Sequence, residues 1–411
     1  MNHGVQQPLK SPKPQPHSMC LVRARVATAL VFLMFGTIVG AWTSRIPSIK
    51  ADLQLSDSQL SVALVTFALG SITGMVVLGR FIDRIGSGMV MTVLVAAQGL
   101  FLIFPALAPA PWSLSVALFI LGSAQGTLNV AMNANAVEVE QVWGSPVMSS
   151  FHAVFSLGGF LGAAIGGLSA AIGLSVLATF AIVCCGSLAV CALAALWRLR
   201  RAGSADSPAS AEQVREATPP PKESFVILLG LLAMFAMVAE GAAGDWSAVY
   251  LRNNLGTTTA FAAAAFVAFS IAMMLARLLE DRIVARIGPA HLVRWSAFSA
   301  AIAFGICGLV IATPLSAIIG FAALGAGLAG ITPQIYSFAG QLNSNGAGRR
   351  LSMIVGMGYT GFLLGPAVIG FTSSLTGLRA ALAIPAVLVL FVAIAAGALR
   401  TPKAEFLAAT E

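Results

Sequence analysis

Charged residues and catalytic motifs are scarce in this sequence. Only 9% of its 411 residues are charged, whereas soluble domains carry roughly 25%. None of the five lysines follows a glycine, so the chain has no phosphate-binding loop of the ATPase type. It also has no Gly-x-Ser-x-Gly elbow and no loop with His, Cys and carboxylates at zinc spacing. These absences predict a protein that is not an enzyme and that binds no cofactor or metal.

Paired cysteines and a basic face are missing as well. The five cysteines are odd in number, and Cys184, Cys185, Cys191 and Cys307 lie inside apolar segments. We interpret these four as small buried hydrophobic residues rather than disulfide partners. The formal net charge of +8 is carried by basic residues between apolar segments, and this distribution argues against nucleic acid as a partner.

Long apolar runs fill most of the chain. Hydrophobic residues make up 58% of it and the mean hydropathy is +0.90. About 20 helical residues cross the hydrocarbon core of a bilayer, and continuous apolar runs do not fit the short alternating strands of a barrel. The sequence therefore predicts an all-α membrane protein with twelve transmembrane helices, at about 25–44, 58–79, 89–108, 112–135, 147–171, 174–197, 225–246, 259–279, 292–312, 315–338, 350–373 and 377–399.

The basic residues predict how these helices are oriented. With the loops assigned alternately to the two sides, 19 of the 23 Lys and Arg residues fall on the side of both termini. By the positive-inside rule, both termini then lie in the cytoplasm of a multi-pass inner (plasma) membrane protein. We expect a disordered tail at 1–22, a six-helix bundle at 23–199, a cytoplasmic linker at 200–223, a second bundle at 224–400 and a tail at 401–411.

The two predicted bundles share an internal repeat. Gly40 and Trp42 recur as Gly244 and Trp246, an offset of 204 residues. Similar offsets relate Ser149 to Ser352, and the pair Asp83 and Arg84 to Asp281 and Arg282. Parallel six-helix repeats are typical of secondary transporters, whose substrate site lies between the halves near the middle of the membrane.

The loop at 79–86 carries a motif. It reads Gly-Arg-Phe-Ile-Asp-Arg-Ile-Gly and resembles the loop signature of the major facilitator superfamily, although Ser87-Gly88 replaces the further basic residues usual there. The segments 41–47, 129–133 and 244–247 resemble a bacterial branch with fucose-permease-like character. The resemblance implies two pseudo-symmetric six-helix bundles with helices 1, 4, 7 and 10 around a central cavity.

A polar stripe marks the fourth predicted helix. Gln125, Asn129 and Asn133 recur every four residues and so share one face. The stripe could bind a neighbouring helix or a substrate, and the resemblance favours the substrate. The expected substrate-binding residues are Trp42, Gln125, Asn129, Asn133, Trp246, Gln334 and Tyr359.

Three titratable residues are candidates for proton coupling. Glu240 and Asp245 lie five residues apart on the seventh helix and so face different directions, with Glu240 deeper. A buried carboxyl can bind and release a proton in the physiological range. His152 could relay protons or could anchor helices by hydrogen bonding, and Glu240 could equally be a structural acid.

Charged residues at helix ends are candidates for gating. We expect Asp83 to accept hydrogen bonds near the start of the eleventh helix and Asp281 to do so near Ser149 of the fifth. Simple topology charges are the alternative for these residues. On the outer face, Arg45 and Asp245 could pair when the mouth closes, or could anchor to lipid headgroups and local backbone. The expected gating residues are Arg45, Asp83, Arg84, Asp281 and Arg282.

Together these features predict a secondary active transporter that works by alternating access as a symporter or antiporter. The expected partners are a small polar molecule such as a sugar, protons and the lipid bilayer, and the expected oligomeric state is a monomer. Efflux of amphiphilic toxic compounds and a transport-inactive membrane sensor are the alternatives.

Overall fold

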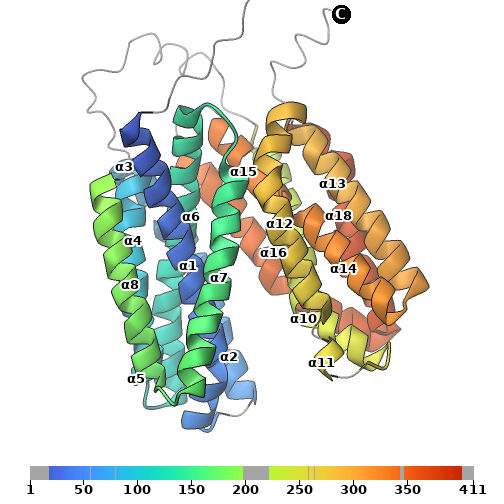
Figure 1. Ribbon diagram of the computed structural model, residues 1–411, viewed down its shortest axis with the longest axis horizontal. Helices are drawn as coiled ribbons and strands as arrows, with labels where there is room; N and C mark the ends of the chain where they lie inside the picture. The colour runs from blue at the N-terminus through green and yellow to red at the C-terminus, as the bar shows by residue number, and fades with distance from the viewer. Residues whose placement is uncertain are drawn as a thin grey trace, which may run out of the picture.

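The computed structural model describes residues 18–55, 57–78, 80–197, 222–257, 259–262, 264–342 and 347–399. Most of the two expected tails and of the linker lies outside these residues. The described chain is helical almost throughout (Figure 1). Its first half comprises α1 (Met19–Asp52), α2 (Asp57–Thr73), η1 (Gly74–Leu78), α3 (Arg80–Ile85), α4 (Ser87–Phe101), α5 (Phe104–Leu107), α6 (Pro111–Trp143), α7 (Met148–Ala171) and α8 (Val176–Trp197).

The second half is likewise helical. It comprises α10 (Glu223–Asn253), α11 (Thr259–Ala262), α12 (Ala264–Ile287), α13 (Pro289–Ala303), η2 (Phe304–Ile311), α14 (Pro314–Leu328), α15 (Ile331–Gln341), α16 (Ala347–Thr376), α17 (Leu378–Ala381), α18 (Ala383–Ala395) and η3 (Ala396–Leu399). Each of the twelve expected segments coincides with one helix or with a run of consecutive helices, so the twelve-helix layout is confirmed. Within the described residues, nine helices are long and apolar enough to cross a membrane, and Val62–Val77 is a shorter apolar helix.

Several helices continue well past the apolar windows. The sequence predicted ends near 44, 135 and 246, but α1, α6 and α10 run on to Asp52, Trp143 and Asn253. The apolar windows used for the prediction cover only the part of a helix that lies in hydrocarbon. The helix itself continues until a residue that favours a turn ends it. Gly144, with φ at 75°, ends α6 in the left-handed conformation that glycine adopts at low cost.

The helices form two bundles, coloured blue to green and yellow to red in Figure 1. In the first bundle α1 packs on α7 and α8, and α2 packs on α6; in the second α10 packs on α16, and α12 packs on α14. The bundles touch through α7 with α12, through α15 with α6 and α7, and through α16 with α2, η1, α3 and α6. They approach each other at the end that holds Met19 and Leu399, the terminal face, and diverge toward the opposite face (Figure 1).

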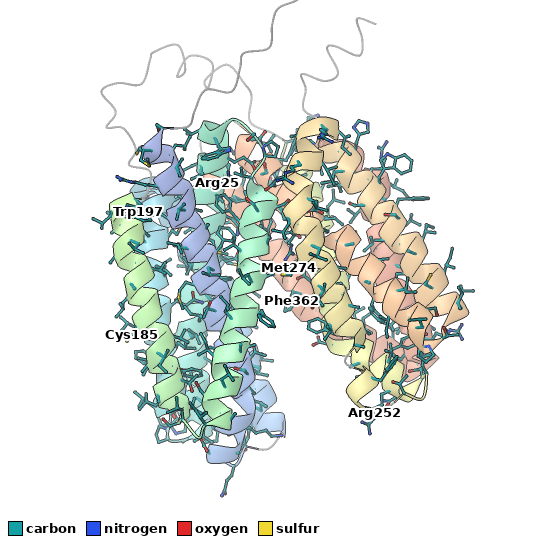
Figure 2. The ribbon with its side chains drawn as sticks, viewed as in Figure 1. Arg25, Cys185, Trp197, Arg252, Met274 and Phe362 are labelled. Carbon is teal, nitrogen blue, oxygen red and sulfur yellow. The ribbon has the colours of Figure 1, made fainter. Side chains whose placement is uncertain are left out.

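The cysteines differ in part from expectation. All five are free, and Cys184 is buried as the sequence predicted. Cys185 is instead exposed and points outward from α8 (Figure 2). An apolar sequence environment does not distinguish the inside of a bundle from its lipid-facing surface, because both are apolar.

Glycines let α1 and α7 approach to backbone contact. A Cβ built on Gly162 of α7 would lie 2.8 Å from the Ala41 nitrogen of α1. The same construction on Gly167, five residues later, meets nothing within 4 Å. Small residues that bring helix backbones together are a main source of packing between membrane helices.

We therefore predict opposite outcomes for two alanine substitutions on α7. Gly162→Ala should separate α1 from α7 and destabilise the fold by about 1 to 3 kcal/mol, the usual cost of overpacking. Gly167→Ala should leave stability unchanged or raise it slightly, because alanine favours helix. Thermal unfolding of the purified variants in detergent measures both, and equal midpoints for the two variants would contradict the close contact.

Candidate functional site

A polar cluster joins the two bundles about midway along α6. Gln125 accepts a hydrogen bond from Gln98 Nε2 of α4 at 3.1 Å and donates one to the Tyr359 hydroxyl of α16 at 3.4 Å. Asn129, one turn later, also lies next to the Tyr359 hydroxyl. The stripe on α6 therefore reaches a side chain of the other bundle at two successive positions.

Asn133, the third member of the stripe, has a different environment. It is fully buried, and its Nδ2 donates to the backbone and side-chain oxygens of Asn129. Its Oδ1 lies 3.2 Å from His152 Nε2 of α7. Asn133 therefore ties α6 to α7, as the helix-binding alternative expects. Gln125 and Asn129 face the other bundle, and substrate contact there stays a prediction.

The second bundle contributes two tyrosines and an acid. Glu240 of α10 lies within electrostatic reach of the Tyr336 and Tyr359 hydroxyls. Tyr336 is almost fully buried, and its ring lies 6.3 Å from that of His152. A Cβ on Gly358 would lie 3.3 Å from the Tyr336 hydroxyl, so a glycine there leaves room for that group. We call Gln125, Asn129, Glu240, Tyr336 and Tyr359 the central cluster.

The two tryptophans of the repeat do not occupy equivalent environments. Trp42 is buried within the first bundle with its ring 6.3 Å from that of Phe180, so it packs in the core, and its expected substrate contact stays a prediction. Trp246 lies against Gly370 of α16, and its buried indole nitrogen has no acceptor among the described residues. The repeat predicts that the two tryptophans occupy equivalent positions on their helices, but it does not predict which residues pack around them.

At the diverging face, Arg45 and Asp245 have different environments and do not contact each other. Arg45 is buried and donates from Nη2 to the Leu174 carbonyl at 2.8 Å, within its own bundle. Asp245 is exposed on α10. No ion pair joins the two in the described structure, and the expected pairing concerns a form closed at this face.

The bundles are held together at the terminal face by the start of α7. Asp281 of α12 accepts hydrogen bonds from the backbone nitrogens of Ser149 at 2.9 Å and Ser150 at 2.8 Å. Glu140 of α6 accepts from Val147 at 2.8 Å and Met148 at 2.9 Å. The sequence predicted the Asp281 contact near Ser149, and it is present. We call these contacts the joint.

Further polar contacts surround the joint. The Glu140 carboxylate also accepts from the Ser337 hydroxyl of α15, and Gln334 donates to Ser149 Oγ at 3.3 Å. Gln334, an expected substrate-binding residue, therefore lies at the terminal face and not in the central cluster. The symmetry-related candidate Asp83 lies outside the residues whose side chains are described, and Arg84 and Arg282 are exposed.

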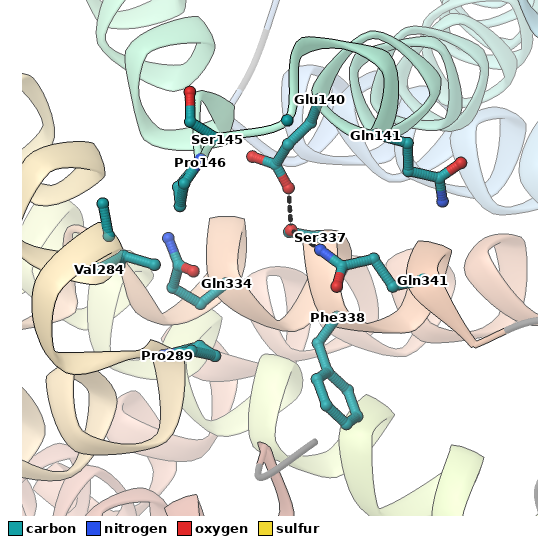
Figure 3. A pocket seen from close by; sticks show the side chains of 12 residues that line it. Glu140, Gln141, Ser145, Pro146, Val284, Pro289, Gln334, Ser337, Phe338 and Gln341 are labelled. Atoms are coloured by element: carbon teal, nitrogen blue, oxygen red, sulfur yellow. Dashed lines mark hydrogen bonds between the residues drawn. The ribbon is translucent and has the colours of Figure 1, made fainter. Parts of the chain in front are cut away.

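A cavity of about 490 Å³ opens beside the joint (Figure 3). Both bundles line it: Glu140, Gln141 and Ser145 on one side face Val284, Gln334 and Gln341 on the other. Gln141 crosses to the second bundle by donating to the Gly340 carbonyl at 3.0 Å.

A family model described as Major Facilitator Superfamily matches residues 26–342. The chain belongs to the major facilitator superfamily. An uncharacterised transporter of this superfamily from Yersinia pestis is 33% identical over 377 residues, covering 92% of this chain and 96% of that protein. The family and its members are transporters, so the prediction that the chain is not an enzyme is confirmed.

Two solved superfamily structures share the fold. A variant of the E. coli fucose:proton symporter FucP has a TM-score of 0.73 at 15% identity, covering 93% of this chain and 100% of that one. The proton:xylose symporter XylE has a TM-score of 0.71 at 14% identity, covering 91% and 94%. These likenesses confirm the superfamily architecture with its twelve helices, and the resemblance to fucose permeases.

Several residues of this superfamily member escaped the sequence analysis. Tyr336 belongs to the central cluster and Glu140 to the joint, while Gln98 contacts the cluster and Glu280 lies beside the joint, and the sequence singled out none of the four. Gln98 is a lone polar residue in an apolar helix, and this signal could have found it. Glu140 and Glu280 follow the apolar windows and read as ordinary helix-end charges, so only the fold shows that they are buried.

The Asn133 and His152 contact predicts non-additive stability. Asn133→Ala and His152→Ala should each destabilise the protein, and the double variant should cost less than their sum by about 0.6 to 1.7 kcal/mol, the range for interhelical hydrogen bonds in membranes. Unfolding by SDS titration measures the cycle. Strict additivity would show that the two side chains do not bond.

Proposed function

We propose that this chain is a secondary active transporter that carries a small polar organic molecule, such as a sugar, together with protons by alternating access. The observation that carries the proposal is the central cluster, in which α6 side chains meet Tyr359 across the two bundles. A site built from both halves changes when the halves rock. Substrate binding and conformational change are thereby coupled.

The orientation follows from the basic residues. The loop assignment made from the sequence puts 19 of the 23 Lys and Arg residues on the side of both termini, so the terminal face is cytoplasmic and the protein lies in the inner membrane. The joint then closes the cytoplasmic side, and the bundles diverge toward the periplasm (Figure 1). This arrangement is an outward-facing state.

The chemistry of the cluster suits a neutral hydroxylated substrate. Two amides and two phenol hydroxyls can donate and accept hydrogen bonds, and the Trp246 N–H offers a further donor. Such groups orient sugars within a mostly apolar site. The names of the structural neighbours, a fucose:proton and a xylose symporter, point to the same substrate class.

Proton coupling falls to Glu240. Glu240 is only partly buried and lies within electrostatic reach of both tyrosines of the cluster, so bound substrate and a proton act on one group of side chains. Asp245, five residues on, is exposed away from them. His152 is engaged with Asn133, which favours an anchoring role.

An uptake assay in proteoliposomes with an imposed proton gradient tests the function directly. Radiolabelled fucose, xylose and other neutral monosaccharides should include at least one that accumulates against its gradient. Accumulation that collapses with a protonophore supports symport. Protection against amphiphilic toxins without any sugar uptake would instead favour efflux, and no transport of either class would favour the sensor.

The assignment of Glu240 predicts a selective defect. Glu240→Gln should keep exchange of substrate across the membrane but abolish accumulation driven by a pH gradient, because a neutral amide cannot bind and release the proton. Asp245→Asn is the matched control and should retain accumulation. Uphill transport by Glu240→Gln at the normal level would reject the assignment.

A further inference from the structure

A further carboxyl is buried beside the joint, and one of its oxygens has no hydrogen-bond partner among the described residues. Glu280 of α12 is 3% exposed. Its carboxyl lies beside the Ser149 side chain and packs against Gly330, where an added Cβ would lie 2.7 Å from it. Its Oε2 has no hydrogen-bond partner among the described residues. Its two neighbours differ, because both oxygens of Glu140 and both of Asp281 accept hydrogen bonds.

Two arginines lie near Glu280 and its neighbouring acids. Arg277, one turn earlier on α12, is 5% exposed and donates to Ser156 Oγ of α7 at 2.7 Å and to the Ala329 carbonyl. The second cation is Arg25, which acts electrostatically on Asp281 and donates to Ser150 Oγ at 3.4 Å. It lies near the terminal face (Figure 2).

The two arginines lie near three carboxyl groups, those of Glu140, Asp281 and Glu280. Glu140 and Asp281 cap the start of α7, where the helix dipole and four amides stabilise negative charge. Glu280 lacks these donors, and a buried ionised oxygen without a partner is costly. With Glu280 neutral, the two remaining carboxylates balance Arg25 and Arg277.

We propose that Glu280 is a proton-binding site on the cytoplasmic face, and that closing the joint takes up one proton there. The proposal rests on the cytoplasmic orientation given under the proposed function. Gln334 lines the cavity beside the joint (Figure 3) and donates to Ser149 Oγ at 3.3 Å, and the Ser149 side chain lies next to Glu280. Only these two side chains therefore separate Glu280 from the cavity. When α7 separates from α12, water reaches Glu280 and the proton leaves to the cytoplasm.

The direction of the pH effect follows from this uptake. The closed joint binds one more proton than the open one, so acidification of the cytoplasmic side favours the closed joint and alkalinisation favours the open one. One linked proton changes the closed-to-open ratio by up to tenfold per pH unit. The cytoplasmic pH thereby sets how readily the carrier returns to its outward-facing state.

Distance measurement between spin labels tests this without any substrate. Cysteines at Leu196 of α8 and Trp295 of α13, both exposed, are labelled in the full chain with the native cysteines replaced. Between pH 5 and 9 the short-distance population should fall as pH rises, by up to tenfold per unit. Glu280→Gln should hold the short distance at all pH values, while Glu223→Gln, an exposed acid of the same face, should respond like the parent.

Each result decides the proposal separately from transport. A parent without pH dependence, or a Glu280→Gln variant with the parent's slope, would overturn it even if sugar uptake is found. Where Glu280→Gln fails to fold, Glu280→Asp serves instead. It should keep the response with a shifted midpoint, and an unshifted midpoint would also overturn the proposal.

Discussion

The start of α7 imposes the constraint on which this structure depends. A helix leaves its first four N–H groups without intrahelical partners, and such groups must find acceptors when they are buried. Here two carboxylates supply them. Glu140 serves Val147 and Met148 from within the first bundle, while Asp281 serves Ser149 and Ser150 from the second. The backbone of one half is therefore incomplete without a side chain of the other, and this fixes where α12 stands against α7.

Hydrogen bonds between carboxylates and backbone amides can break and re-form when the two bundles move relative to each other. Backbone amides and carboxylates can exchange each other for water, so the net cost of separating them is only about 1.5 to 3 kcal/mol per charged hydrogen bond. A state held by a few such bonds can be balanced against a second one by substrate or protons. The central cluster uses weaker links across the same interface, such as the 3.4 Å contact between Gln125 and Tyr359.

The sequence predicted the fold well because membrane thickness and charge asymmetry leave strong periodic signals. It also placed Asp281 opposite Ser149, since the repeat related that residue to a recognisable loop motif. It did not predict that Trp42 and Trp246 have different environments, because equivalent positions on the two helices pack against different residues. Glu280 was missed for a similar reason: a glutamate beside arginines at a helix end looks solvated until packing removes the water.

Amide hydrogen exchange across residues 147–150 tests the shared helix start most directly. In the Asp281→Asn variant, the amides of Ser149 and Ser150 should exchange at least about tenfold faster than in the parent, corresponding to loss of a charged hydrogen bond. Those of Val147 and Met148 should keep their protection, because Glu140 moves with α7. Unchanged exchange at Ser149 and Ser150, or an equal rise at all four amides, would contradict a helix start divided between the two halves.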